Sequence, residues 1–142
     1  MKKNLLIIFA TLALFSCIQD DLETPIQPPI VSNELTASDF VKGSEDIPLV
    51  SNLVLSENNN VDFDSDSGSF AVVDYESPFD LEVVQGFYLR TLPQMGWKLV
   101  KNDQKHSRFI RDSEKLEIDF IQSDTEDEDD LVRFSLSSIS KK

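Results

Sequence analysis

The chain has 142 residues with 13 Lys plus Arg and 26 Asp plus Glu, which gives a formal net charge of −13. A surface this negative repels phosphate groups, which argues against a nucleic-acid partner and against direct adsorption to anionic lipid headgroups. Hydrophobic residues make up 40% of the chain and include ten Phe, which is too many for a wholly disordered acidic chain. The length fits one folded domain together with targeting and linker segments.

The first 17 residues have the order of a secretory signal. Lysines near the start are followed by an apolar run of about 11 residues from Leu5 to Phe15, and then by Ser16 and Cys17. A transmembrane helix needs about 20 apolar residues to cross the hydrocarbon core, so this run is too short to span a membrane. We expect residues 1–16 to be a signal peptide that is removed from the mature protein.

The end of this segment resembles the lipobox of bacterial lipoproteins. Leu14, Phe15 and Ser16 precede Cys17, the single cysteine of the chain, at the position where these proteins carry a diacylglycerol. Phe15 departs from the pattern, because a small residue is usual there. An alternative is that Cys17 is incidental to an ordinary signal. Each buried methylene of an acyl chain contributes about 0.8 kcal/mol, so two or three chains anchor a protein firmly.

The resemblance implies a protein that is anchored in the bacterial cell envelope and faces the periplasm. In enteric-type sorting, an Asp directly after the lipidated cysteine retains a lipoprotein at the inner membrane. This chain has Ile18 there, which favours the outer membrane. Loss of Lys2 and Lys3 with the signal, which contains no acidic residue, changes the formal net charge from −13 to −15.

Residues 17–45 have the composition of a spacer. They are acidic at first, then contain Pro25, Pro28 and Pro29, and then Ser, Asn, Thr and Gly with apolar residues at no fixed period. Segments of this kind are extended, at about 3 Å per residue. We expect them to link the lipid to a folded domain at residues 46–140.

The strongest predicted element is an amphipathic helix over residues 81–95. Its apolar stripe recurs at spacings of three and four, at Leu81, Val84, Tyr88, Leu92 and Met95. Asp80 is a plausible N-cap and Gly96 a plausible C-terminal stop, while Pro93 predicts a distorted last turn.

Segments around the helix alternate with period two, as half-buried strands do. They are residues 61–64, 69–76, 97–100, 108–111, 116–122 and 131–138. Consecutive strands joined by short turns pair antiparallel, and a single helix covers one face of a sheet. We therefore predict an α+β fold of two layers, with one helix packed on a curved antiparallel sheet of about five strands. The expected order is β-β-α-β-β-β, or close to it.

Several short motifs of the domain occur together, namely Tyr75-Glu76-Ser77-Pro78, Val84, Phe87-Tyr88, Leu92-Pro93, Gly96-Trp97, Arg108-Phe109 and Leu116-Glu117-Ile118. With these motifs the domain resembles a family of small uncharacterised bacterial proteins, many of them predicted lipoproteins of alphaproteobacteria. The family shares a helix end of the form fY…LPxxGW followed by a strand hairpin. The resemblance covers about residues 46–138 and implies a fold, but its motifs carry no activity.

Three alternating aspartates, Asp62, Asp64 and Asp66, are a weak candidate for a calcium site. Counted from Asp62, positions 6 and 12 of an EF-hand loop are Ser67 and Val73, where that loop requires Gly and a bidentate Glu. The main interpretation is therefore a solvated hairpin turn.

A block of carboxylates lies between the last two predicted strands, at Asp124, Glu126, Asp127, Glu128, Asp129 and Asp130. Such a block is usually a solvated loop. The alternatives are a surface for a basic partner and loose binding of divalent cations.

No set of residues in the sequence predicts catalysis. His106 is the only histidine, and the chain contains no G-x-S-x-G elbow and no phosphate-binding glycine loop. We expect no enzyme activity, cofactor or metal centre, with an unrecognised hydrolase as the least favoured alternative. Phe87, Tyr88 and Trp97 are expected in the core. A site for a small apolar ligand between them and the sheet is the other alternative.

The leading hypothesis is an envelope lipoprotein with a non-catalytic binding or assembly role. It is based on the expected anchor and spacer, and on the lack of any set of residues in the sequence that predicts catalysis. The expected partners are the membrane, through the lipid on Cys17, and another envelope protein.

Overall fold

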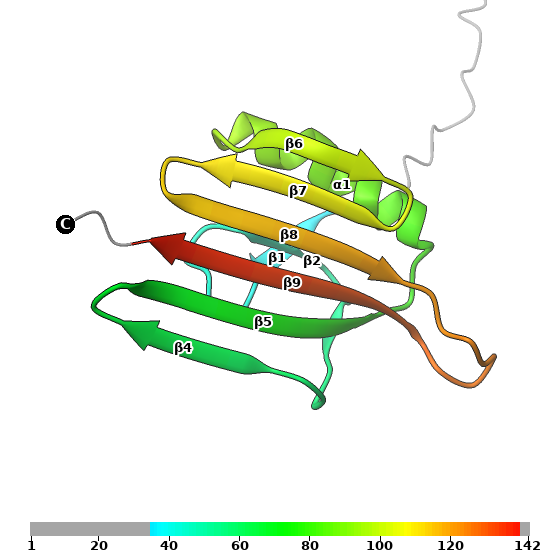
Figure 1. Cartoon of the computed structure of the whole chain (residues 1–142). Helices are drawn as coiled ribbons and strands as arrows, with labels where there is room; N and C mark the ends of the chain where they lie inside the picture. The colour runs from blue at the N-terminus through cyan, green and yellow to red at the C-terminus, as the bar shows by residue number, and fades with distance from the viewer. Residues whose placement is uncertain (1–34, 140–142) are drawn as a thin grey trace, which may run out of the picture. The chain divides into compact units, whose positions relative to one another are not determined.

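The computed structural model describes residues 35–139. The signal peptide, Cys17 and most of the expected linker lie outside this range, so the expectations about them stay predictions. In chain order the elements are β1 (Ala37–Phe40), β2 (Pro48–Val50), β3 (Val54–Leu55), β4 (Val61–Ser65), β5 (Gly68–Ser77), α1 (Leu81–Gln94), β6 (Lys98–Asp103), β7 (His106–Arg111), β8 (Glu114–Ile121) and β9 (Asp130–Ile139). Figure 1 shows their arrangement.

Strands β3 to β9 form one open antiparallel sheet. Its order is β3-β5-β9-β8-β7-β6, and β4 also pairs with β5. The α+β class is confirmed, but the sheet has seven strands instead of about five. All four segments predicted after the helix form strands, one more than the order β-β-α-β-β-β contains. Strand β3 has only the two residues Val54 and Leu55, which is too short to produce a period-two pattern.

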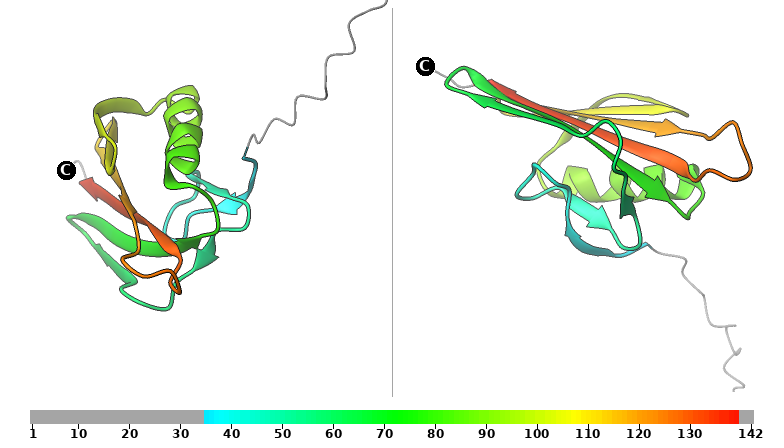
Figure 2. Two further views of the ribbon diagram at one scale, coloured as in Figure 1. Left: turned by 90° about the vertical axis from the view of Figure 1, so that its right-hand side faces the viewer. Right: turned by 90° about the horizontal axis from the view of Figure 1, so that it is seen from below.

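One face of this sheet is covered and the other is open. Helix α1 and the β1–β2 hairpin lie on the same side of the sheet in Figure 1, and Figure 2 shows the sheet bending over them. The core cluster draws on all three parts, for example on Ile47, Val84 and Phe109, which are all 0% exposed. We call the side that contacts α1 the covered face and the opposite side the open face.

Helix α1 begins and ends close to the predicted positions. Three positions of the predicted stripe are buried, namely Val84, Tyr88 and Leu92. Pro93 lies in the last turn, and Gly96 follows with a φ of +88°, a left-handed conformation that glycine adopts without strain. Asp80 is the N-cap residue as predicted, but its side chain makes no capping hydrogen bond.

The folded unit begins before the expected boundary at Asp46. Strand β1 pairs with β2, and Val41 and Ile47 are 3% and 0% exposed in the core cluster. Residues 35–45 therefore belong to the domain, which corrects their assignment to the linker. Because Val41 is the single buried residue of that segment, it sets no hydrophobic period, and the polar composition around it resembles a spacer.

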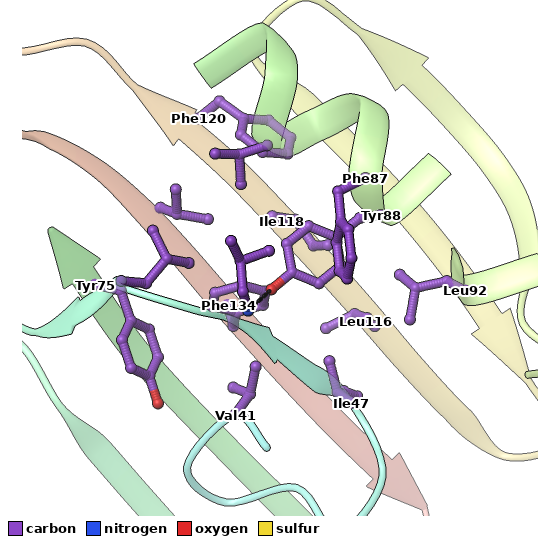
Figure 3. Packing of buried hydrophobic residues seen from close by; sticks show 14 of the residues in the cluster. Val41, Ile47, Tyr75, Phe87, Tyr88, Leu92, Leu116, Ile118, Phe120 and Phe134 are labelled. Carbon is purple, nitrogen blue, oxygen red and sulfur yellow. Dashed lines mark hydrogen bonds between the residues drawn. The ribbon is translucent and has the colours of Figure 1, made fainter. Parts of the chain in front are cut away.

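Two tyrosines hold the β1–β2 hairpin against the core. The Tyr88 hydroxyl donates to the carbonyl oxygen of Pro48 at 3.0 Å and accepts from the N–H of Val50 at 3.4 Å; Figure 3 shows this hydroxyl directed at β2. The Tyr75 hydroxyl accepts from the N–H of Lys42 at 2.9 Å. Burial raises the pKa of both phenols above its ordinary value.

Unfolding at alkaline pH is expected to depend on Tyr88. Because its folded-state pKa is raised, the unfolded state loses the phenolic proton first, so the stabilisation is complete below about pH 10 and falls as the pH rises further. The loss is about 1.4 kcal/mol per pH unit for each such tyrosine. Urea unfolding between about pH 10 and 12 should therefore show a steeper fall in stability for the wild type than for Tyr88→Phe. Equal slopes would contradict this role of the buried phenol.

Arg111 connects the hairpin loop to the sheet. Its guanidinium forms ion pairs with Asp46 and Glu114, the latter at 2.7 Å, and lies 4.3 Å from the centroid of the Trp97 ring. Trp97 is 2% exposed, and its indole N–H has no hydrogen-bond partner within residues 35–139. In the described part of the chain, the Trp97 ring thus interacts with a polar group through its cation–π contact with Arg111.

Candidate functional site: the open face of the sheet

The strand register defines which residues share the open face, because paired residues of antiparallel strands point to the same side. One row of paired residues runs across the sheet through Val61, Val72, Ser135, Glu117, Arg108 and Lys101. A parallel row contains Phe63, Phe70, Ser137, Lys115, Ile110 and Lys98. A third contains Asp74, Arg133, Asp119, His106 and Asp103.

The chemical character of the open face changes from one edge to the other. At the β4 edge, Val61, Phe63 and Phe70 are 51%, 61% and 42% exposed. Next to them, β9 contributes the small polar residues Ser135 and Ser137. Lysine, arginine and acidic side chains follow on β8, β7 and β6. In the rows through Val61 and Phe63, the open face therefore consists of an apolar strip, a serine strip and a charged strip, which also contains Ile110, 41% exposed. The third row adds the Asp74–Arg133 pair.

Short ion pairs organise the charged strip. His106 Nδ1 lies 2.7 Å from an Asp119 carboxylate oxygen, Arg108 donates to Glu117 at 2.6 Å, and Lys115 Nζ lies 3.7 Å from Glu117. Burial raises the pKa of Glu117, but the hydrogen bond from Arg108 and the neighbouring positive charges outweigh burial, so this pKa lies below its ordinary value. Partly exposed pairs contribute about 1 kcal/mol or less each, and their main effect here is to hold the charges in place.

The Asp74–Arg133 pair differs from the others because its carboxylate is fully buried. Arg133 Nε and Nη2 donate to the two carboxylate oxygens of Asp74 at 2.7 and 2.8 Å, which is the strong bidentate geometry. The backbone of Asp74 also accepts from the N–H of Ser56 at 2.9 Å and donates to Asn60 Oδ1 at 3.2 Å. This pair therefore connects β5, β9 and the segment before β4.

His106 and Ser107 do not form a catalytic pair. Neighbouring residues in a strand point to opposite faces, so His106 lies beside Asp119 on the open face while Ser107 is fully buried on the covered face. The Ser107 hydroxyl donates to Asn102 at 2.7 Å and accepts from Gln85 of α1 at 3.1 Å. These contacts join the helix to β6 and β7 and give the hydrolase alternative no support.

The aromatic residues that were candidates for a ligand site are packed in the core. Phe87, Tyr88 and Trp97 are 7%, 0% and 2% exposed. The Tyr88 ring meets Phe87 and Phe134 edge to face, at centroid distances of 5.1 and 5.3 Å, and Figure 3 shows these rings between the helix and the sheet. The packing favours the core interpretation over an apolar ligand at this place.

The three aspartates proposed for calcium do not converge. Asp62 and Asp64 lie on β4, on the side opposite to Val61 and Phe63, and Asp66 lies in the turn before β5. Within residues 35–139, no three His, Cys, Asp or Glu side chains form a group that could hold a metal ion.

The acidic block lies in the loop between β8 and β9, which projects beyond the end of the sheet (Figure 1). The base of the loop is closed by Asp130, whose carboxylate accepts from the N–H of Ser123 at 2.9 Å. Two hollows of about 510 and 520 Å³ flank the loop, one next to the 56–59 segment and the other next to residues 77–80. Carboxylates line both hollows, and none of the described Lys and Arg residues does.

The sequence analysis missed the apolar strip, although a signal for it exists. The segment 69–76 is predicted above to alternate with period two, but its residues 70–73 read Phe-Ala-Val-Val, a continuous apolar run. A strand with one solvated face alternates between apolar and polar residues. Continuous runs are typical of strands that are covered on both faces. Phe70 and Val72 of this run lie on the open face, and Phe70 is 42% exposed in the described structure, so the run is the sequence signal of the apolar strip.

Comparison with known proteins adds no relative, because no family model, curated protein or solved structure matches the chain. The resemblance to the small bacterial family and to the lipobox therefore stays a prediction. Among residues 35–139, no helix is long and apolar enough to cross a membrane.

Proposed function

We propose that this chain is a lipoprotein of the bacterial cell envelope, anchored through Cys17, whose domain binds a protein partner without catalysis. The open face of the sheet is the observation that carries the binding role. The lipobox-like residues 14–17 support the anchor, and Ile18 supports placement at the outer membrane on the periplasmic side.

The apolar strip is the part of the open face that most favours a partner. Val61, Phe63 and Phe70 are adjacent by register and exposed to 42% or more. Contiguous exposed apolar residues on an otherwise charged surface mark interaction sites. The neighbouring ion pairs restrain the charged side chains, which reduces the entropy lost when a partner binds.

The anchor is tested by a Cys17→Ser variant of the full chain expressed in a bacterium. The wild type is expected in the outer-membrane fraction with an acylated N-terminal peptide by mass spectrometry, and the variant is expected without the acyl mass and outside that fraction. If both proteins partition alike and neither carries acyl chains, Cys17 is incidental and the anchored hypothesis is wrong.

The binding role is tested by photo-crosslinking in the living cell. A benzophenone amino acid at Ser137 places the reactive group on the open face, and the same group at the exposed helix residue Arg90 is the control. We expect a light-dependent adduct with an envelope protein from the Ser137 position alone. Adducts from neither position, or equal adducts from both, would argue against a partner on the open face.

A further inference from the structure

We infer that β4 accepts an added strand from a partner protein, in a segment whose residues alternate between apolar and positively charged. The inference rests on the proposed binding role and specifies the chemistry of the partner. Its basis is that three features coincide on β4 within residues 35–139: a strand edge with no further neighbour, exposed apolar side chains, and carboxylates without an ion pair.

The first observation is the free edge. All five residues of β4 are exposed, and within the described residues the strand pairs with β5 and with no other strand. In an antiparallel strand every second residue directs its N–H and C=O away from the existing neighbour. Unpaired backbone groups of this kind are a template for another strand, which many protein complexes use for peptide recognition.

The second observation is the apolar side of β4. Val61 and Phe63 lie on the open face and pair with Val72 and Phe70 of β5. A strand added beside β4 would place its own apolar side chains next to Val61 and Phe63 and remove them from water. The added strand would therefore continue the apolar strip in the plane of the sheet.

The third observation is the charged side of β4. Asp62 and Asp64 point away from the open face, and no described Lys, Arg or His forms an ion pair with either of them. Cross-strand pairs of opposite charge stabilise a sheet, and like charges destabilise it. Lysine or arginine residues at alternate positions of the added strand would therefore face these two carboxylates.

A second copy of this chain fits the edge less well than a basic strand. If two β4 strands paired antiparallel about Phe63, each Asp62 would face Asp64 of the other copy. The net charge of −13 adds long-range repulsion between copies. The charges of the edge therefore favour a cationic partner.

Binding is tested with dye-labelled peptides and the full chain, by fluorescence anisotropy. The probe has the sequence Lys-Val-Lys-Val-Lys-Val-Lys, and its control has the same composition in two blocks, Lys-Lys-Lys-Lys-Val-Val-Val. We expect the alternating peptide to bind at least about tenfold more tightly, and the amides of residues 61–65 to gain protection from hydrogen exchange in its presence. Equal affinity for the two peptides, or no binding of either, would overturn the inference.

Charge reversal on β4 locates the site. The variant Asp62→Lys/Asp64→Lys keeps an exposed strand and should bind the lysine peptide about tenfold more weakly, since two exposed ion pairs are lost. It should instead bind a peptide in which Glu replaces Lys. The matched control Asp127→Lys/Asp129→Lys makes the same change in net charge in the acidic loop and should retain affinity. An equal loss in both variants would show non-specific charge attraction and refute the β4 site.

The outcomes separate this inference from the proposed function. If the Ser137 crosslink to an envelope protein persists in Asp62→Lys/Asp64→Lys, the binding role stands and strand addition at β4 is wrong. If the chain self-associates in sedimentation and Phe63→Lys abolishes this, the occupant is a second copy and the inference is also wrong.

Discussion

Replacement of Phe134 by alanine is expected to lower the free energy of unfolding by about 3–5 kcal/mol. Phe134 is 1% exposed and packs edge to face against Tyr75 and Tyr88, at centroid distances of 5.8 and 5.3 Å. Its removal leaves a cavity between the sheet, the helix and the hairpin, where the surrounding side chains relax only partly. Urea unfolding followed by Trp97 fluorescence measures the loss.

The matched control for Phe134→Ala is Phe40→Ala. Phe40 lies on β1 and is 52% exposed, so the same chemical change removes little buried surface. We expect a loss of about 1 kcal/mol or less. If the two variants lose similar stability, the edge-to-face cluster around Phe134 is not the centre of the core.

The second large effect is expected from Arg133→Met. This change leaves the carboxylate of Asp74, which is 0% exposed, without the two hydrogen bonds that Arg133 supplies. Removal of one partner of a buried ion pair costs about 3–5 kcal/mol. The Arg133 side chain is itself 33% exposed, so water relieves part of this cost, and we expect a loss of about 2–3 kcal/mol in urea unfolding.

Two further variants distinguish the cost of an unpaired buried carboxylate from the cost of losing any ion pair on this face. The double variant Asp74→Leu/Arg133→Met removes both charges and should recover most of the stability, because no unpaired charge stays buried. Arg108→Met breaks the partly exposed pair with Glu117 on the same face and should cost about 1 kcal/mol or less. A double variant no more stable than Arg133→Met would contradict the account of an unpaired buried carboxylate.

Local sequence patterns predict the helix and the longer strands. The stripe through Val84, Tyr88 and Leu92 sets the helix, with Gly96 at its end, and alternation in β8 and β9 gives the buried residues of the central sheet. Short elements carry no such period. Strand β3 has two residues. Strand β1 is held by its pairing with β2, and the hairpin is held by Tyr75, which contacts Lys42 in its loop, and by Tyr88, which contacts β2; both tyrosines are distant in sequence.

The candidate site depends even more on tertiary structure. The sequence shows that Val61, Phe63 and Phe70 are apolar but not that the helix and the hairpin cover the opposite face of the sheet. The position of α1 decides which face is open, and the register places the three residues together. His106 and Ser107 were not predicted to point to opposite faces, because the predicted strand begins at residue 108, whereas β7 begins at His106 and alternation then applies to both residues.

The position of β9 has a consequence for the order of folding. It is the last strand described in the chain, yet it lies between β5 and β8 and is the strand that joins the two parts of the sheet. During synthesis from the N-terminus, both parts are present before residues 130–139 are added to connect them. Pairings of such long sequence separation, as between Gly68 and Ile139, form slowly. Closure of the seven-stranded sheet should therefore wait until residues 130–139 are available, and the earlier strands are joined into one sheet only at that point.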